Sequence, residues 1–476
     1  MTNRDNIPLV ADLDGTIIVT DTLLESTIIA IRRRPFILFL LPFWILKGKL
    51  FFKQSIDHYA RCHPELLPYR QDVLDFIKLE KKKGRKIVLA TATVKPIADS
   101  VSDYLGIFDE VIATESVNLR SNEKSRVLIE KYGERGFDYI GDSKADIAVW
   151  ASSGVAHIVH RTESLTKKAQ KSGNVGNVFF PEQTTIKDFI KEIRVYQWIK
   201  NILILLPLLM AHLVADFHLI ILNIIAFFAF SLTASSVYVL NDLFDIEADR
   251  AHKRKRFRPI ASGKINVPSA LYLSIFLFSI GIIFSIFFLP LNFFLVLVVY
   301  LILTTLYSFS LKEIYIVDII ILAGLYTLRL IAGGMAVDVE VSYWMLAFSL
   351  FLFLNLAIVK RYTELNQLVE TNETKAKGRG YHVEDLSLLR SLGTSSGYLS
   401  VLVFALYVNS KEVLGLYKRP EMLWAIAPML LYWITRIWFV AHRGKMHDDP
   451  IVFTAKDPVS YVVGFLVLIL IIGAAL

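Results

Sequence analysis

The pattern of apolar and polar positions divides the chain into two parts. In the first part, residues 1 to 190, short apolar runs such as 8–11 and 86–90 alternate with amphipathic stretches. That alternation predicts an α/β domain with a parallel sheet. In the second part, residues 191 to 476, the apolar runs are long enough to cross a bilayer. This part is predicted to be an all-α bundle of transmembrane helices.

Nine apolar stretches of the second part are predicted to cross the membrane. They lie near residues 198–216, 218–240, 268–288, 291–310, 316–336, 342–359, 393–409, 421–441 and 458–476. Lysine and arginine are concentrated in the segments 241–264, 360–392 and 442–456, which the positive-inside rule assigns to the cytoplasm. An odd number of crossings then leaves the C-terminus outside.

Composition, net charge and cysteine content further limit the class of protein to which the chain can belong. Of the 476 residues, 54% are hydrophobic, and the formal net charge of +8 suits loops beside anionic lipid or anionic substrates. No nucleic-acid-binding motif is present, and the single cysteine, Cys62, excludes an intrachain disulfide. Residues 1–8 lack the apolar region of a signal peptide, so we expect a cytoplasmic N-terminal domain on a bacterial inner membrane protein. The sequence leaves a homo-oligomer open.

Acidic residues precede basic ones between the second and third predicted spans. Asp242, Asp245 and Asp249 fall at i, i+3 and i+7, and Asn241 precedes Asp245 by four, so a helix would place their oxygens on one face. Such a face suits Mg²⁺, which prefers carboxylates, water and substrate phosphates. Cations for further phosphate follow at Lys253, Arg254, Lys255, Arg256 and Arg258. The alternative is a solvated loop that obeys the positive-inside rule.

Other polar residues lie within or beside the predicted spans. They are Lys200 in the first, Tyr307 at the end of the fourth, Lys312 just after it, Arg329 in the fifth, and Lys360 and Arg361 after the sixth. An arginine inside a membrane segment costs roughly 2.5 kcal/mol or more unless it meets a partner or water. Arg329 is therefore expected to face a cavity or to form a salt bridge between helices. The cations at span ends either bind phosphate or snorkel to the interface.

In the first part, acidic residues follow the predicted strands. Asp12 and Asp14 end the strand 8–11, and Asp142 and Asp146 follow a strand near 138–141. Open α/β sheets bring the carboxyl ends of their strands to one crevice, so these carboxylates are predicted to meet there. Read singly, each acid could instead cap a helix or close a turn.

These motifs resemble all four motifs of the haloacid-dehalogenase (HAD) hydrolase superfamily, over about residues 8 to 160. The resemblance implies a Rossmann-like domain with a helical cap at about residues 20 to 80. It implies Asp12 as nucleophile and Asp14 as general acid/base. It further implies phosphoryl contacts from Thr91, with Thr93 as an alternative, and from Lys124, and a Mg²⁺ site of Asp12, Asp14, Asp142 and Asp146. A carboxylate can form an aspartyl-phosphate once metal and lysine offset the repulsion between two anions.

Two further segments of the first part carry predictions. The apolar run 35–46, with twelve residues, is too short to span a bilayer. Because Arg32, Arg33, Arg34, Lys47 and Lys49 flank it, we expect an interfacial helix in the cytoplasmic leaflet, the alternative being a buried cap helix. The segment 161–176, rich in Lys, Ser and Gly, indicates a surface tail or a linker.

The Asn-Asp-x-x-Asp-x-x-x-Asp motif at 241–249 resembles that of the UbiA superfamily of intramembrane prenyltransferases, and the resemblance covers most of residues 191 to 476. It is closer to one branch, decaprenyl-phosphate 5-phosphoribosyltransferase. The segments that carry this closer match are 197–201, 249–261, 307–312 and 360–365. The second acidic motif of ordinary prenyltransferases is absent after the fourth span, where Lys312, Glu313 and Asp318 stand instead.

The resemblance implies transfer of a 5-phosphoribosyl group from phosphoribosyl pyrophosphate to a polyprenyl phosphate. Extra cations suit this substrate set, which brings a diphosphate and two further phosphates to one site. Mg²⁺ would bind Asp242, Asp245 and Asp249. The predicted substrate ligands are Lys200, Asn241, Lys255, Arg256, Arg258, Tyr307, Lys312, Arg329, Lys360 and Arg361. The fused HAD domain would then remove the 5-phosphate. The alternatives are a prenyltransferase with an aromatic acceptor, and a lipid carrier or scaffold that only binds Mg²⁺.

Overall fold

The computed structural model describes residues 7–160, 163–172, 174–370, 374, 379–446 and 449–476. The chain divides into two compact units. Unit 1 comprises Met1–Ile193 and Tyr238–Leu273, and unit 2 comprises Arg194–Val237 and Ser274–Leu476. Each unit contains buried apolar clusters of its own, so each has a separate core.

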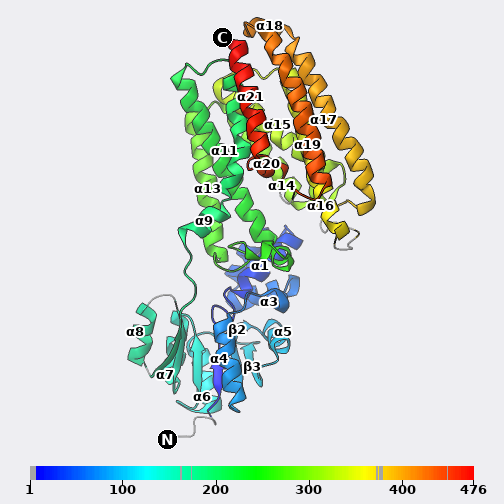
Figure 1. Cartoon of the computed structure of the whole chain (residues 1–476). Coiled ribbons are helices and arrows are strands. Elements are labelled where there is room, and N and C mark those ends of the chain that lie inside the picture. The colour runs from blue at the N-terminus through cyan, green and yellow to red at the C-terminus, as the bar shows by residue number, and fades with distance from the viewer. Residues whose placement is uncertain (1–6, 161–162, 173, 371–373, 375–378, 447–448) are drawn as a thin grey trace. The chain divides into compact units, whose positions relative to one another are not determined.

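Unit 1 is built on a parallel sheet, of which Figure 1 labels β2 and β3. The sheet has six strands in the order β3-β2-β1-β4-β5-β6. The strands are β1 (Leu9–Ala11), β2 (Ile87–Val94), β3 (Glu110–Thr114), β4 (Asp138–Gly141), β5 (Ala156–Val159) and β6 (Val175–Phe179). Val10 of β1 pairs with Val88 on one side and Tyr139 on the other. The strand order reverses at β1, and such a switch point is where open sheets place their ligands.

Unit 1 also contains ten helices and three 3₁₀ turns among its described residues. They are α1 (Thr22–Arg33), α2 (Ile37–Leu46), α3 (Lys49–Tyr59), α4 (Gln71–Lys82), α5 (Lys95–Leu105), α6 (Asn122–Tyr132), α7 (Ile147–Ser152), α8 (Glu163–Ser172), α9 (Ile186–Glu192) and α12 (Ile246–Ala251), with the 3₁₀ turns η2 (Pro64–Leu66), η3 (Lys144–Asp146) and η5 (Lys255–Phe257). Successive strand residues face opposite sides, so Leu9 packs in a cluster with residues of α4 and α5, and Val10 in a cluster with residues of α6 and α7. The predicted α/β class is confirmed.

Two predicted boundaries in unit 1 differ from the structure. The cap insertion ends near Tyr69, where the chain returns to pair with Ile18, because α4 packs against the sheet. The segment 161–176, predicted to be a tail or linker, contains α8 and the start of β6, apart from the residues that lie outside the described ones. Leu165 and Ala169, one helical turn apart, bury this helix against the core, a signal that the surrounding lysines obscured.

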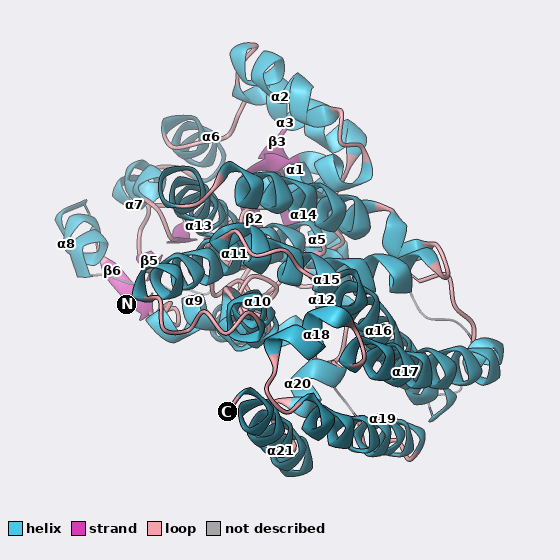
Figure 2. Cartoon of the chain, turned by 90° about the horizontal axis from the view of Figure 1, so that it is seen from above, coloured by secondary structure: helices cyan, strands magenta, loops and turns pink. Residues whose placement is uncertain are grey.

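Unit 2 is helical throughout the residues that the structure describes. Its elements are η4 (Val195–Leu205), α10 (Leu206–Met210), α14 (Leu291–Phe309), η6 (Leu311–Glu313), α15 (Val317–Val337), α16 (Tyr343–Glu370), η7 (Val383–Asp385), α17 (Leu386–Val408), α18 (Lys411–Leu416), η8 (Pro420–Ala425), α19 (Ile426–His442), α20 (Pro450–Thr454) and α21 (Pro458–Ala475). Two long helices, α11 (Phe217–Phe244) and α13 (Val267–Phe288), begin or end in unit 1. Helices α16 and α17 lie side by side (Figure 2), where Gly397 allows the close approach of Asn355.

Eight described helices are long and apolar enough to cross a membrane, or nine if the pair Ile186–Glu192 and Val195–Met210 forms one span. They correspond to the predicted stretches. The first predicted stretch differs in form, because η4 is an unusually long 3₁₀ segment and α10 begins with Pro207 in its first turn. The outer faces of these helices carry exposed side chains such as Phe287 and Phe465, as expected for contact with lipid.

Candidate active sites

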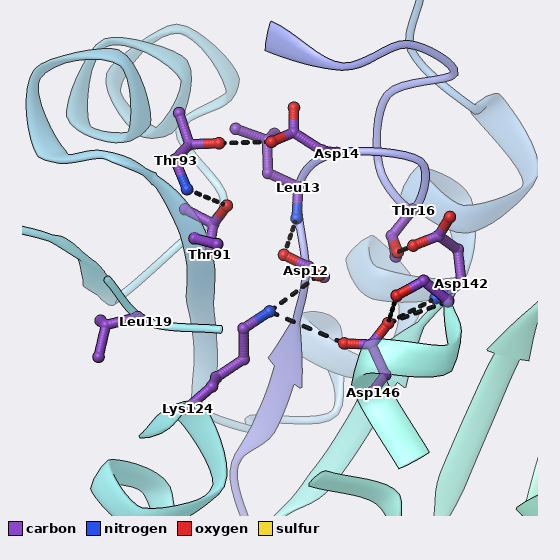
Figure 3. Close-up of polar contacts among 12 residues, drawn as sticks. Asp12, Leu13, Asp14, Thr16, Thr91, Thr93, Leu119, Lys124, Asp142 and Asp146 are labelled. Atoms are coloured by element: carbon purple, nitrogen blue, oxygen red, sulfur yellow. Dashed lines mark hydrogen bonds and ion pairs between the residues drawn. The ribbon is translucent and has the colours of Figure 1, made fainter. Parts of the chain in front are cut away.

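The first candidate site lies at the carboxyl end of β1, where Asp12 meets Lys124 (Figure 3). The Nζ atom of Lys124, from α6, lies 2.8 Å from Oδ2 of Asp12 and donates to the Tyr139 hydroxyl at 2.8 Å. Gly15 forms the turn beyond Asp12 with φ +73°, and a Cβ there would lie 2.2 Å from Asp142. Only glycine therefore allows the two acidic loops to approach this closely.

Hydrogen bonds hold the Asp14 side chain away from the contact between Asp12 and Lys124. Its Oδ1 accepts from the backbone N–H of Thr22 at 2.8 Å, and its Oδ2 accepts from the Thr93 hydroxyl at 2.6 Å. Burial, followed by repulsion from Asp21, raises the pKa of Asp14 to about 7. A carboxyl group with a raised pKa suits proton transfer to and from a leaving oxygen.

The two threonines of β2 differ in position. Thr93 lines the cavity above the site and contacts Asp14. Thr91 is buried beneath it and accepts from the Thr93 N–H at 3.1 Å. Both remain candidates for the phosphoryl contact.

Three carboxylates converge beside Lys124. Each carboxylate contributes one oxygen, and these three oxygens, from Asp12, Asp142 and Asp146, all lie within 4.8 Å of one another. Such a group could hold a metal ion. Burial raises the pKa of Asp12 and of Asp142, and the repulsion between the clustered acids adds to the effect. A divalent cation would relieve both effects, so these residues fit Mg²⁺. The side chain of Asp14 does not belong to this group.

Lys124 balances part of the negative charge. Its Nζ lies 3.8 Å from Asp146 as well as 2.8 Å from Asp12. Burial alone would lower the pKa of Lys124, but the attraction of these acids outweighs it and holds that pKa above its usual value. The lysine therefore stays charged and is placed to stabilise an incoming phosphoryl group.

A cavity of about 650 Å³ opens above these groups. Lys53 of α3 reaches over it and donates to the Ala92 carbonyl at 2.6 Å and to the Asn118 side chain at 2.7 Å. Arg120 also lines the cavity. The sequence offered no motif for these residues, because they come from the cap and from a loop between β3 and α6.

The second candidate site is the acidic segment at the end of α11. The predicted single helix is interrupted at Asp245, although the backbone bonds from Asp245 to Asn241 and from Asp249 to Asp245 continue the helical pattern. Asp242 and Asp249 both accept from Nη1 of Arg258, at 3.0 and 2.6 Å. Two of the predicted carboxylates thus converge on one cation.

Asp245 does not join that pair. Its carboxylate lies 3.5 Å from Arg32 of α1. Within the residues that the structure describes, no second group of three metal-binding side chains approaches as closely as that around Asp12. The arrangement therefore fits a metal at Asp242 and Asp249 only in part, and the three-aspartate Mg²⁺ site stays a prediction.

The basic residues after this segment are divided by exposure. Lys255 and Arg256 are exposed, with the Arg256 guanidinium 4.8 Å from the Phe257 ring centre. Arg258 is half-buried against the aspartates. Both exposed cations are accessible to an anion, and both are also compatible with a solvated loop.

In unit 2, two predicted substrate ligands share a partner that the sequence did not suggest. Lys200 and Lys360 each donate to Oδ2 of Asp449 at 3.0 Å. Asp449 lies 249 residues from Lys200 in the sequence, and no motif marks it. Burial opposes the charge of Asp449, but the two lysines hold its pKa well below the usual range.

Arg361 is fully buried in an ion-pair cluster. Its Nε donates to Asp318 at 2.5 Å, and its other nitrogens bind Glu364 and, at 3.0 Å, the Tyr307 hydroxyl. Arg379 donates to the same hydroxyl at 2.9 Å and to the Lys312 carbonyl at 3.4 Å. Tyr307 and Arg361 therefore lie in one hydrogen-bonded cluster with Arg379, which also binds the Lys312 backbone. The Arg361 charge is already paired, and a role of these residues in substrate binding stays a prediction.

Arg329 has partners within unit 2. Its Nε donates to Asn201 at 2.8 Å, another nitrogen binds the Leu325 carbonyl, and its guanidinium lies 5.2 to 5.3 Å from three aromatic ring centres. Because the Asn201 side chain is neutral, this contact is a hydrogen bond between helices and not the salt bridge that was the predicted alternative.

Family models match both parts of the chain. The UbiA prenyltransferase family model matches residues 203–456, and the haloacid dehalogenase-like hydrolase model matches residues 9–150. The uncharacterized protein y4nM of Sinorhizobium fredii is 36% identical over 466 residues, covering 97% of this chain and 90% of that protein.

Other relatives match the membrane part. The decaprenyl-phosphate phosphoribosyltransferase of Mycolicibacterium smegmatis is 33% identical over 304 residues, covering 62% of this chain and 94% of that enzyme. A UbiA homolog from Archaeoglobus fulgidus, solved with GPP and Mg²⁺, covers 60% of this chain and 99% of that one at 15% identity and a TM-score of 0.46. With the family model spanning more than half of its length, this chain belongs to the UbiA prenyltransferase family, as a multi-pass membrane transferase with an N-terminal HAD hydrolase domain.

Proposed function

We propose that the chain transfers the 5-phosphoribosyl group of phosphoribosyl pyrophosphate to a polyprenyl phosphate. The observation that carries this proposal is the 33% identity to the Mycolicibacterium smegmatis decaprenyl-phosphate phosphoribosyltransferase over 94% of that enzyme. Exposed cations at Lys255 and Arg256 support it, because the substrates bring more phosphate than a single metal site can neutralise.

In this reaction an oxygen of the lipid phosphate attacks C1 of the ribose. The C1–O bond to pyrophosphate breaks, and pyrophosphate leaves with the electron pair. Asn241 and the exposed cations would bind the donor, and Asp242 with Asp249 would hold Arg258 in place beside it. Magnesium, if held there, would supply charge stabilisation for the leaving group.

The test is a transfer assay with membranes that contain the full chain. Labelled phosphoribosyl pyrophosphate and polyprenyl phosphate should give a labelled lipid extract, and Asp242→Asn should abolish it. Incorporation of labelled prenyl diphosphate into an aromatic acceptor, with no label from the ribosyl donor, would instead establish the prenyltransferase alternative.

We also propose that the HAD domain removes the 5-phosphate from the lipid-linked product. Asp12 would attack phosphorus, the bond between phosphorus and O5 of the ribose would break, and Asp14 would protonate that oxygen. Water would then attack the aspartyl-phosphate, with Asp14 taking its proton, to release inorganic phosphate. The 2.8 Å contact between Lys124 and Asp12 supports this assignment, and a magnesium ion at Asp12, Asp142 and Asp146 would offset the phosphoryl charge.

Phosphate release from the purified lipid product tests the second step. Wild-type protein should release phosphate, and Asp12→Asn should leave the 5-phosphate in place while transfer activity continues. Unchanged release in Asp12→Asn would refute the coupling. We further propose that the protein lies in the bacterial inner membrane, with residues 1–190 in the cytoplasm and the C-terminus outside.

A further inference from the structure

An apolar helix is left uncovered on the surface of unit 1. Helix α2 contains ten residues, Ile37–Leu46, all of them apolar. Phe36, Phe39, Phe43 and Leu46 recur every three or four residues, so they lie along one face. These four side chains are 50%, 75%, 65% and 85% exposed. Soluble surfaces rarely present large apolar groups in so continuous a row.

The opposite face of α2 holds the helix in place. Ile37, Leu41 and Trp44 recur with the same helical spacing and pack against the core of unit 1. The Trp44 ring stacks on Tyr59 of α3, with ring centres 5.5 Å apart and an interplanar angle of 24°. Because this face is anchored, the exposed row is a fixed feature of the folded domain.

The charge around α2 indicates what covers it. No acidic residue occurs between Glu25 and Asp57, whereas this interval contains six cations: Arg32, Arg33, Arg34, Lys47, Lys49 and Lys53. Arg34, Lys47 and Lys49 are exposed at the two ends of α2. An apolar face with cations at its borders complements the acyl chains and anionic headgroups of a bilayer. A protein surface would need its own acidic groups around an apolar groove.

We propose that α2 docks into the surface of an anionic membrane, so that the phosphatase cavity takes a phosphate monoester borne on a lipid. The second half of this inference rests on the proposed function. Ile45 of α2 and Lys49, Phe52 and Ile56 of α3 all line that cavity, so the docking element forms part of its wall. A lipid-borne substrate would reach Asp12 without leaving the bilayer surface.

Depth-dependent quenching in the full chain tests the docking. A fluorophore is attached at Phe39→Cys, with Lys78→Cys on the exposed face of α4 as the control, and native Cys62 is buried. The protein is placed in anionic vesicles that contain spin-labelled lipids. An interfacial helix lies about 5–10 Å deep, so a quencher near the headgroups should act more strongly at position 39 than one at the bilayer centre. Position 78 should show neither effect.

Three outcomes would overturn the docking. They are no quenching at position 39, stronger quenching from the bilayer centre, and a blue-shifted emission that lipid quenchers do not reduce, which would place a second copy of the chain on α2. Each is measured without phosphatase activity, so failure of the proposed function does not affect this readout.

An activity ratio tests the substrate class. Phe39→Asp should lower hydrolysis of the lipid-linked phosphate several-fold and leave that of p-nitrophenyl phosphate unchanged, since Phe39 does not line the cavity. Equal activity of Phe39→Asp and wild type on the lipid substrate would refute the role of α2 in delivery. If wild-type protein hydrolyses only p-nitrophenyl phosphate, the proposed function and the lipid-borne substrate both fail, while quenching still decides the docking.

Discussion

Replacing Arg361 by leucine is expected to destabilise unit 2. The guanidinium is 1% exposed and is the ion-pair partner of Asp318, which is fully buried. After the substitution, Asp318 would keep the hydrogen bond from the Tyr381 hydroxyl at 2.6 Å but lose its cation. Removing one partner of a buried ion pair costs about 3–5 kcal/mol. For a unit of this size that corresponds to a Tm lower by roughly 10 °C.

The assay is thermal unfolding of the full chain in detergent for Arg361→Leu, Asp318→Asn and the double variant. Each single substitution leaves a buried charged or polar partner unpaired. The loss in free energy of unfolding for the double variant should therefore be smaller than the sum of the two single losses, by about 0.5–3 kcal/mol. Lys255→Ala is the control: because this side chain is exposed, the variant should change the free energy of unfolding by no more than about 0.5 kcal/mol and raise KM for phosphoribosyl pyrophosphate.

The result that would refute this reasoning is an Arg361→Leu variant with an unchanged Tm and a raised KM for phosphoribosyl pyrophosphate. Additive losses in the double variant would also contradict it, because they would show that Arg361 and Asp318 do not depend on one another. The first of these outcomes would assign Arg361 to substrate binding, as the sequence predicted.

Three further predictions concern other ionisable groups. Lys124→Met should lower kcat for phosphate release by roughly 10²–10³ because it removes the cation 2.8 Å from Asp12, whereas Lys131→Met on the surface of α6 should not. Lys200 and Lys360 depress the pKa of Asp449 in the folded protein. The ionised carboxylate should therefore make its full contribution to the free energy of unfolding at every pH above the pKa that Asp449 has in the unfolded chain. The Tm gap between wild type and Asp449→Asn should thus stay constant from about pH 8 to 5 and narrow only below about pH 4; a gap that narrows near neutral pH would contradict this. Burial raises the pKa of Cys62 to about 12, so roughly one thiol in 10⁴ is ionised at pH 8, and a maleimide should label it only after denaturation.

The HAD-like site could be predicted largely from local sequence. Asp12 and Asp142 each follow a strand directly, and parallel strands bring their carboxyl ends to one edge whatever the loops between them contain. The residues that escaped prediction, Lys53 and Arg120, come from a cap helix and a loop that no strand end positions. Their contribution depends on how the cap folds back over the sheet, which the sequence pattern does not encode.

In unit 2, the sequence predicted the position of the cations but not the residues that pair with them. Lys200, Lys360 and Arg361 were recognisable because charges are rare beside apolar runs. Whether such a charge is free for substrate depends on acids distant in the chain, and Asp449 lies 249 residues from Lys200. In unit 1, the helical spacing of Asp242 and Asp249 predicted that these two carboxylates converge, whereas Asp245 does not join them because the helix is interrupted at that residue.

Burial divides the cations of the transferase into two groups with different consequences. Arg361 and Lys200 already have carboxylate partners in the interior, so binding a phosphate to them would require breaking an ion pair. Lys255 and Arg256 are hydrated at the surface, and a phosphate that binds them replaces only water. The second group is therefore expected to dominate donor affinity. Arg258 is intermediate, because a metal that took its place between Asp242 and Asp249 would release this arginine to the substrate.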